Sequence, residues 1–177
     1  MRSILTAAAI FLPLVSASAA DEPFTFMGHA IGDPLAKWKS SLDINDTIGW
    51  CKKPNELGVK RCNDKSLKKE GLSNKIGTAY VNWLYWIYLD DKLAGFELSG
   101  QWADVEALRD MLIGKFGRPD EIGGDTWTWH MSNGPLVLEQ DRGKSLLHMF
   151  DEASLRVVEQ RQVAKKNESM EAGKRSF

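Results

Sequence analysis

Only two cysteines occur among the 177 residues, and the charges of opposite sign nearly cancel, with 23 basic against 24 acidic residues. Two thiols are too few for a disulfide-rich mini-protein or for a zinc site with four cysteine ligands. A net charge of −1 provides no global field that would recruit nucleic acid or anionic lipid. Because 43% of the residues are hydrophobic, the chain is not disordered, and its length predicts one domain of ordinary size.

Familiar catalytic motifs are also missing. The sequence contains no G-x-S-x-G, H-E-x-x-H, Walker loop, G-x-G-x-x-G or C-x-x-C pattern. The histidines, His29, His130 and His148, lack the close spacing of a zinc site, although His130 and His148 could share a face of neighbouring strands. We therefore predict no catalytic residue, no metal site and no cofactor, and we expect a protein that is not an enzyme.

The N-terminal segment has the pattern of a secretory signal peptide. Arg2 precedes an apolar run from Ile4 to Val15, and small residues follow up to Ala20. A positive start, a short apolar segment and a small-residue exit are typical of a cleaved leader, and the run is too short to span a bilayer. We expect residues 1–20 to be removed, with cleavage before Asp21 preferred over cleavage before Ala20. The mature chain is then expected to be soluble and periplasmic or secreted.

Export affects the interpretation of the two cysteines, Cys51 and Cys62. In an oxidising compartment a lone pair of thiols normally forms a disulfide. A redox-active pair is the alternative, but such pairs typically have C-x-x-C spacing. The sequence therefore predicts a structural disulfide between Cys51 and Cys62.

Hydrophobic periodicity predicts an α+β fold. The pattern favours helices over 34–43, 102–116 and 152–165, and strands over 79–89, 93–99, 126–131, 136–140 and 145–150. Residues 45–75 have no sustained period and are expected to form an irregular segment held by the disulfide. The element order predicts a single domain over residues 21–164, with an antiparallel sheet of about five strands and helices packed on one face. Residues 165–177 are expected to form a polar, disordered tail.

Aromatic residues are concentrated in the strand predicted over 79–89. Alternation places Trp83 and Tyr85 on one face of this strand and Trp86 and Tyr88 on the other. Trp and Tyr are favoured both in cores and at interfaces. If helices cover only one face of the sheet, one of these pairs is exposed or is covered by a partner.

The stretch from Lys52 to Lys69 is a second candidate surface. It holds seven basic and two acidic residues, a local charge of +5 (seven minus two). We expect Lys52, Lys53, Lys60 and Arg61 to contact a partner. A loop ordered by a disulfide suits an acidic protein groove, an anionic lipid headgroup or an anionic glycan. The alternative is a solvated loop whose lysines only maintain solubility.

The segment from Leu112 to Pro119 ends an amphipathic helix with the sequence Lys-Phe-Gly-Arg-Pro and leads into a hairpin that carries Trp129. Over residues 80–150 this layout resembles small outer-membrane-assembly lipoproteins of the SmpA/OmlA type and β-lactamase-inhibitor-like domains. The sequence lacks the lipid-modified cysteine of the former and the evident tandem repeat of the latter, so no functional residue is transferred. The resemblance implies a domain that binds other proteins rather than one that catalyses a reaction.

Together these features predict an exported protein-binding module, in its narrower form an inhibitor or immunity-type protein that acts on a partner protein. Two alternatives stay open. One is a small envelope hydrolase with a site near His130 or His148, because catalytic groups need only converge in space. The other is a binder of anionic lipid or glycan that uses the 52–69 loop. We expect no contact with nucleic acid and no membrane-spanning segment.

Overall fold

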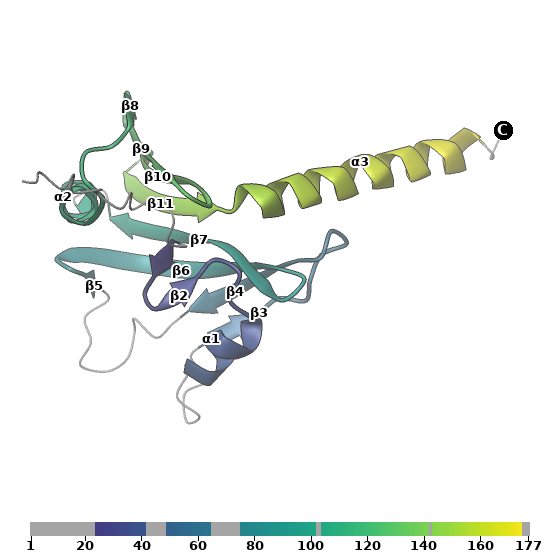
Figure 1. Ribbon diagram of the computed structural model, residues 1–177, viewed down its shortest axis with the longest axis horizontal. Coiled ribbons are helices and arrows are strands. Elements are labelled where there is room, and N and C mark those ends of the chain that lie inside the picture. Colours follow the sequence, from purple (N-terminus) through teal and green to yellow (C-terminus); the bar gives the residue numbers. More distant parts are fainter. Residues whose placement is uncertain (1–23, 42–48, 65–74, 102–103, 142, 175–177) are drawn as a thin grey trace, which may run out of the picture.

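The computed structural model describes residues 24–41, 49–64, 75–101, 104–141 and 143–174, so the predicted leader lies outside the described residues (Figure 1). The helices are α1 (Leu35–Ser41), α2 (Val105–Phe116) and α3 (Glu152–Lys174). The strands of the main sheet are β3 (Gly49–Cys51), β4 (Val59–Asp64), β5 (Lys75–Ile76), β6 (Ala79–Leu89), β7 (Lys92–Gln101), β8 (Glu121–Gly123), β9 (Thr126–Met131), β10 (Gly134–Asp141) and β11 (Lys144–Phe150). A separate small sheet pairs β1 (Thr25–Phe26) with β2 (His29–Ala30).

The main sheet is antiparallel, with the strand order β3-β4-β6-β7-β11-β10-β9-β8 and with β5 added beside β6. It has nine strands where the sequence predicted about five. The five predicted strands are confirmed as β6, β7, β9, β10 and β11. The additional strands are β8, which is only three residues long, β3 and β4 within the segment 45–75 that we expected to be irregular, and β5 at the end of that segment.

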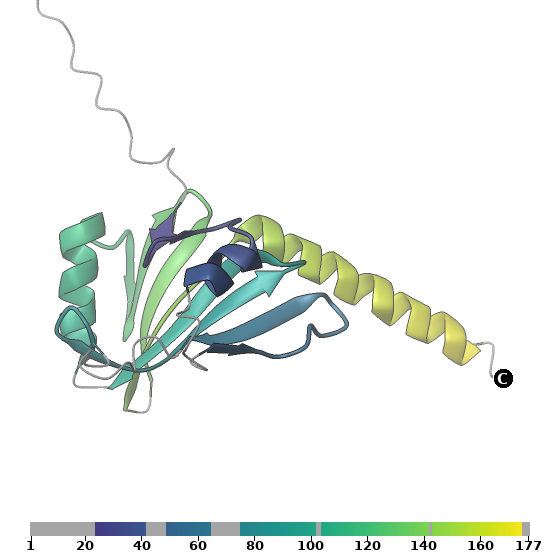
Figure 2. The same cartoon turned by 90° about the horizontal axis from the view of Figure 1, so that it is seen from below.

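The two halves of the sheet have the same topology. In each half a helix is followed by four antiparallel strands, namely α1 with β3, β4, β6 and β7, and α2 with β8 to β11. The halves join where β7 pairs with β11, so that one continuous sheet runs through the molecule (Figure 2). A duplicated arrangement is therefore present in the fold although no repeat is clear in the sequence.

One face of the sheet forms the core together with α1 and α2. On β6 the side chains of Trp86 and Tyr88 are each 1% exposed. Helix α1 contributes Trp38 to this core, and α2 contributes Leu108 and Leu112, which recur four residues apart on one side of the helix. The expectation of helices on one face thus holds for α1 and α2.

The expected end of α2 is confirmed. The backbone N–H of Gly117 donates to the carbonyl of Ile113 over 2.9 Å, and Gly117 has a φ of 83°. A positive φ of this kind favours glycine. Pro119 follows two residues later and cannot continue the helix.

Helix α3 differs from the sequence prediction in length and in position. It continues to Lys174, so residues 165–174, which we assigned to a polar tail, are helical. Its first turns lie against Ile87 and Leu89, which alternate along β6 with the core residues and therefore belong to the opposite face. Beyond the sheet the helix projects away from the rest of the protein (Figures 1 and 2). Among the described residues, no helix is both long enough and apolar enough to cross a membrane.

Polar contacts fix α3 at both ends of its packed part. The carboxylate of Asp151 accepts a 2.8 Å hydrogen bond from the backbone N–H of Ser154 and so caps the helix. Two turns further on, Arg161 donates to both carboxylate oxygens of Asp90, over 3.0 and 2.6 Å, and to the carbonyl of Leu57 over 2.8 Å. Asp90 lies in the β6–β7 turn, so this contact ties the helix to the hairpin below it.

The Cys51–Cys62 disulfide is present, as predicted, and joins directly paired residues of β3 and β4. We expect the double variant Cys51→Ala/Cys62→Ala to lower the free energy of unfolding by about 3 kcal/mol, because an open loop gives the unfolded chain more conformational entropy. Urea denaturation measures this loss. Wild-type protein kept reduced should behave like the double variant, and a double variant as stable as the oxidised protein would contradict the prediction.

The Arg161–Asp90 contact predicts a shifted titration. Hydrogen bonds from Arg161 hold the pKa of Asp90 below its ordinary value. The Arg161–Asp90 ion pair is therefore fully formed at pH values above the ordinary pKa of an aspartate. It is lost as the pH falls through the lowered pKa of Asp90. In Arg161→Gln the pKa of Asp90 should rise towards the ordinary value, as measured by NMR of its carboxyl carbon. Arg156→Gln on the same helix should leave this pKa unchanged, and equal titration in all three proteins would exclude the coupling.

Candidate binding face

Four aromatic side chains lie on the sheet face opposite the core, one on β3 and three on β6. Trp50 and Tyr85 both flank Asn63 in register, so the three residues form one row across β3, β4 and β6. The rings of Trp83 and Tyr85 lie 5.0 Å apart. Tyr80 alternates with the buried Ala79 and Val81 and is directed away from the core. The exposed fractions are 44% for Trp50 and 46% for Tyr80, while Trp83 and Tyr85 are half-buried.

Three of these aromatic rings form a cation–π contact with a basic side chain. The guanidinium of Arg61 lies 4.4 Å from the ring centroid of Tyr85. The Lys75 ammonium lies 4.2 Å from the ring of Tyr80. A third and longer contact places Lys52 5.9 Å from the ring of Trp50. Such contacts hold a cation and a ring in a fixed relation by electrostatic attraction to the face of the ring.

Glu97 is the carboxylate that belongs to this group. It lies directly opposite Tyr85 on β7 and forms an ion pair with Arg61. The Arg61 side chain is 43% exposed in spite of this pair. We call the surface formed by the four aromatic residues with Lys52, Arg61, Lys75 and Glu97 the aromatic–cationic face; its charge is +2 (three minus one).

The sequence prediction identified half of this face. Trp83, Tyr85, Lys52 and Arg61 were expected contact residues, and the structure brings them to one side of the sheet. Trp50, Tyr80, Lys75 and Glu97 were missed. The alternation around Cys51 and Cys62 is the signal that could have placed Trp50, because paired cysteines on two strands fix the register of their neighbours.

Two of the expected contact residues are buried in the core. Trp86 and Tyr88 face the core and are each 1% exposed, so the prediction that they are candidate contact residues is wrong. Burial raises the pKa of the Tyr88 hydroxyl, with further contributions from the charges of Asp33 and Asp64. Helix α1 covers this side of β6, which explains why this pair and not Trp83 with Tyr85 is buried.

The other basic residues of the 52–69 stretch differ in their surroundings. Lys53 is exposed next to the aromatic–cationic face. Lys60 alternates with Arg61 along β4 and forms an ion pair with Asp91, with a side chain only 17% exposed. Lys65, Lys68 and Lys69 lie outside the described residues. The described part of the 52–69 stretch thus consists of a loop over residues 52–58 and of the paired strand β4, where we expected an irregular segment throughout.

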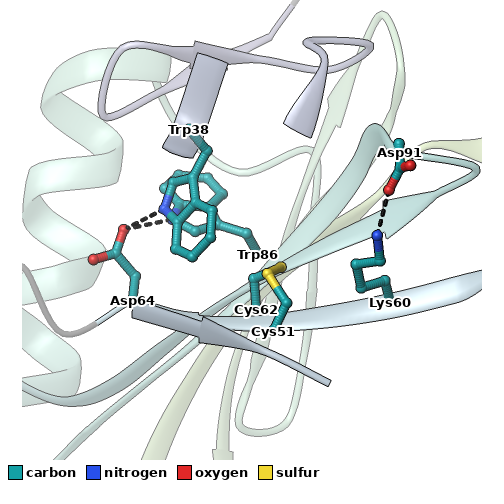
Figure 3. The surroundings of a disulfide bond; sticks show 7 residues. All are labelled: Trp38, Cys51, Lys60, Cys62, Asp64, Trp86 and Asp91. Atoms are coloured by element: carbon teal, nitrogen blue, oxygen red, sulfur yellow. Dashed lines mark hydrogen bonds and ion pairs between the residues drawn. A yellow bond between two sulfur atoms is a disulfide. The ribbon is translucent and has the colours of Figure 1, made fainter. Parts of the chain in front are cut away.

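A buried carboxylate supports this face from the core side (Figure 3). Asp64, at the end of β4, is 7% exposed. It accepts a hydrogen bond from the indole N–H of Trp38 over 3.1 Å and one from the indole N–H of Trp86 over 2.6 Å. One carboxylate therefore joins α1, β4 and β6 next to the disulfide, and it fixes the strands from which Arg61 and Tyr85 project.

The histidines do not converge on one site. His130 on β9 lies 3.0 Å from a carboxylate oxygen of Glu121 and is exposed. His148 on β11 lies opposite Glu97, and strand β10 separates it from His130. His29 packs edge-on against Trp86 with a centroid separation of 4.9 Å, and burial and the charge of Lys37 lower its pKa. Across the described ranges, no three His, Cys, Asp or Glu side chains are grouped as a metal ion would require.

The sequence matches no protein-family model, no curated protein and no solved structure at a significant level. The function therefore has to be argued from the geometry of the chain itself. The aromatic–cationic face is the arrangement with the clearest chemical character, since it combines aromatic area, positive charge and a rigid support.

The Asp64 arrangement predicts a large loss of stability on truncation. Asp64→Ala leaves two buried indole N–H groups without this acceptor, which should cost about 2–4 kcal/mol. Urea denaturation followed by tryptophan fluorescence measures the change. Asn63→Ala, one residue earlier and facing the other side of β4, is the matched control and should cost about 1 kcal/mol or less. Equal losses in the two variants would show that Asp64 has no special structural role.

Proposed function

We propose that this protein is an exported binding module that docks on an acidic surface of a partner protein through its aromatic–cationic face. In the narrower form of the proposal it is an inhibitor or immunity-type protein that covers an acidic groove of its partner. The observation that carries the proposal is the set of four aromatic side chains on a part of the sheet that none of the described helices covers, three of them in contact with a cation.

The residue types support protein binding. Trp, Tyr and Arg are the residues that most often dominate the energy of protein interfaces. Trp50 and Tyr80 expose nearly half of their surface. The guanidinium of Arg61 contacts the ring of Tyr85, and the Arg61 side chain is still partly exposed to solvent. A partner can therefore bury aromatic area and satisfy the guanidinium at the same place.

Rigidity of the support is a second argument. The aromatic side chains project from β3 and β6, of which β3 is held by the disulfide and β6 by the Asp64 contacts. A surface that is already ordered loses little conformational entropy on binding. This favours recognition of a folded partner with a complementary shape.

The charge of the face indicates the chemistry of the partner. Lys52, Arg61 and Lys75 lie over or beside aromatic rings, and Glu97 is already paired with Arg61. This surface therefore has a local charge of +2 on a protein of net charge −1. An acidic patch on the partner would match it and would accelerate association.

Export is supported by the disulfide and by the expected leader. Disulfides persist in oxidising compartments and are rare in the cytosol, and the Cys51–Cys62 pair is closed. The hydrolase alternative has less support, because His130 and His148 lie on strands separated by β10.

The proposal is tested by isolating the partner on immobilised residues 21–177 from an envelope extract and then measuring its affinity in purified form. Tyr85→Ala removes a ring and the support of Arg61, and it should weaken binding about 30-fold. Ile122→Ala is the matched control, because Ile122 is 68% exposed on β8 at the far edge of the sheet. The Ile122→Ala variant should bind the partner with an affinity within about twofold of that of the wild type. Unchanged binding by Tyr85→Ala would refute the proposal.

Ionic strength and ligand type separate the alternative binders. A protein partner that uses aromatic burial should lose only part of its affinity between low and physiological salt, whereas a purely electrostatic contact is largely screened. Vesicles with anionic headgroups and a sulfated glycan serve as direct probes. Tight, Tyr85-dependent binding of either probe would replace the protein partner by an anionic lipid or glycan.

A further inference from the structure

An apolar cavity lies between the first turns of α3 and the sheet, at the end of the face that carries Tyr85. Its volume is about 180 Å³. The apolar side chains of its wall come from the sheet and from the helix: Val59, Ile87, Leu89, Phe150, Leu155 and Val158. The cavity is partly open to solvent at Leu155. The rest of its wall is apolar surface that close packing between a helix and a sheet normally covers.

Two polar residues of the wall, Asp151 and Ser154, form hydrogen bonds with each other. Asp151 accepts hydrogen bonds from the backbone N–H of Ser154 over 2.8 Å and from its hydroxyl over 2.7 Å. The backbone N–H of Asp151 donates to the carbonyl of Ala94 over 2.7 Å. The surface that the wall presents to the cavity is apolar and thus favours an occupant that needs neither charge nor hydrogen bonds.

The cavity is held open from both sides. The Asp151 cap fixes the start of α3, and the bonds of Arg161 to Asp90 and Leu57 fix the helix two turns later. Gly58 lies directly under the second contact, where an added Cβ would come within 2.6 Å of the Arg161 guanidinium. Leu155 lines the cavity and is 42% exposed, so that the cavity reaches solvent beside this side chain.

We propose that this cavity is a binding site for a small, uncharged, apolar molecule of about the size of a single substituted ring. A dry apolar cavity of about 150 Å³ accepts benzene or xenon, and the present volume is of the same order. The site lies outside the aromatic–cationic face and does not depend on the proposed function. Its ligand is selected by shape and by the absence of polar groups, and it enters past Leu155.

The experiment measures the thermal unfolding midpoint of residues 21–177 with increasing toluene. Saturable binding should raise the midpoint by about 3–6 °C when free toluene exceeds its dissociation constant tenfold. Ala94→Leu places extra carbons in the wall of the cavity, since Ala94 lines it and is 5% exposed. This variant should lose the response, as should Val158→Phe.

Val163→Phe is the matched control. Val163 lies on α3 beyond the cavity and is 60% exposed, so this variant should keep the full response. Crystals of the wild-type protein under xenon pressure should show the gas between α3 and β6. No saturable rise in the wild type, an equal rise in Ala94→Leu and Val158→Phe, or xenon bound only elsewhere would each overturn the proposal. The xenon result decides the question if the filled variants do not fold.

Discussion

The carboxylate of Asp64, buried between two indole N–H groups, is the contact on which the arrangement of the first half of the protein depends. A buried charge is tolerated only when hydrogen bonds replace its lost hydration, and Trp38 and Trp86 provide such bonds. The two tryptophans come from α1 and β6, so one group sets the position of a helix and of the two strands beside it. The disulfide then fixes β3 on the outer side of β4. These two links add to the backbone pairing that sets the register of the strands carrying Trp50, Arg61 and Tyr85.

The sequence predicted the parts of the fold where periodicity alone is decisive. Helix α2 has an apolar stripe and a glycine stop, and β6 is dense in β-branched and aromatic residues, so both were predicted close to their observed bounds. Strand β4 was missed because its pattern is polar: Asp64 is a core residue that accepts hydrogen bonds from two tryptophans. The length of α3 was underestimated because the prediction required an apolar stripe. Its last turns instead consist of good helix formers with pairs such as Glu171–Lys174.

The candidate site was likewise predicted only in part. Alternation along β6 correctly separated Trp83 and Tyr85 from Trp86 and Tyr88, but a single strand does not reveal which of its faces a helix will cover. That choice depends on α1, whose Trp38 reaches Asp64 and closes over Trp86. The contribution of Trp50 and Lys75 could not be predicted, because their strands are two or three residues long and gain their position only from pairing with β4 and β6.

The central claim is that the face carrying Trp50, Tyr80 and Tyr85 is the surface that meets a partner, while the far edge of the sheet and the projecting part of α3 stay free. Hydroxyl-radical footprinting of the protein alone and in complex with its isolated partner tests this claim most directly. The account predicts that oxidation of Trp50 and Tyr80 falls strongly in the complex, whereas oxidation of Ile122 and Met170, which are more exposed than these two in the free protein, is unchanged. Protection of Ile122 or Met170 with continued oxidation of Trp50 and Tyr80 would contradict it.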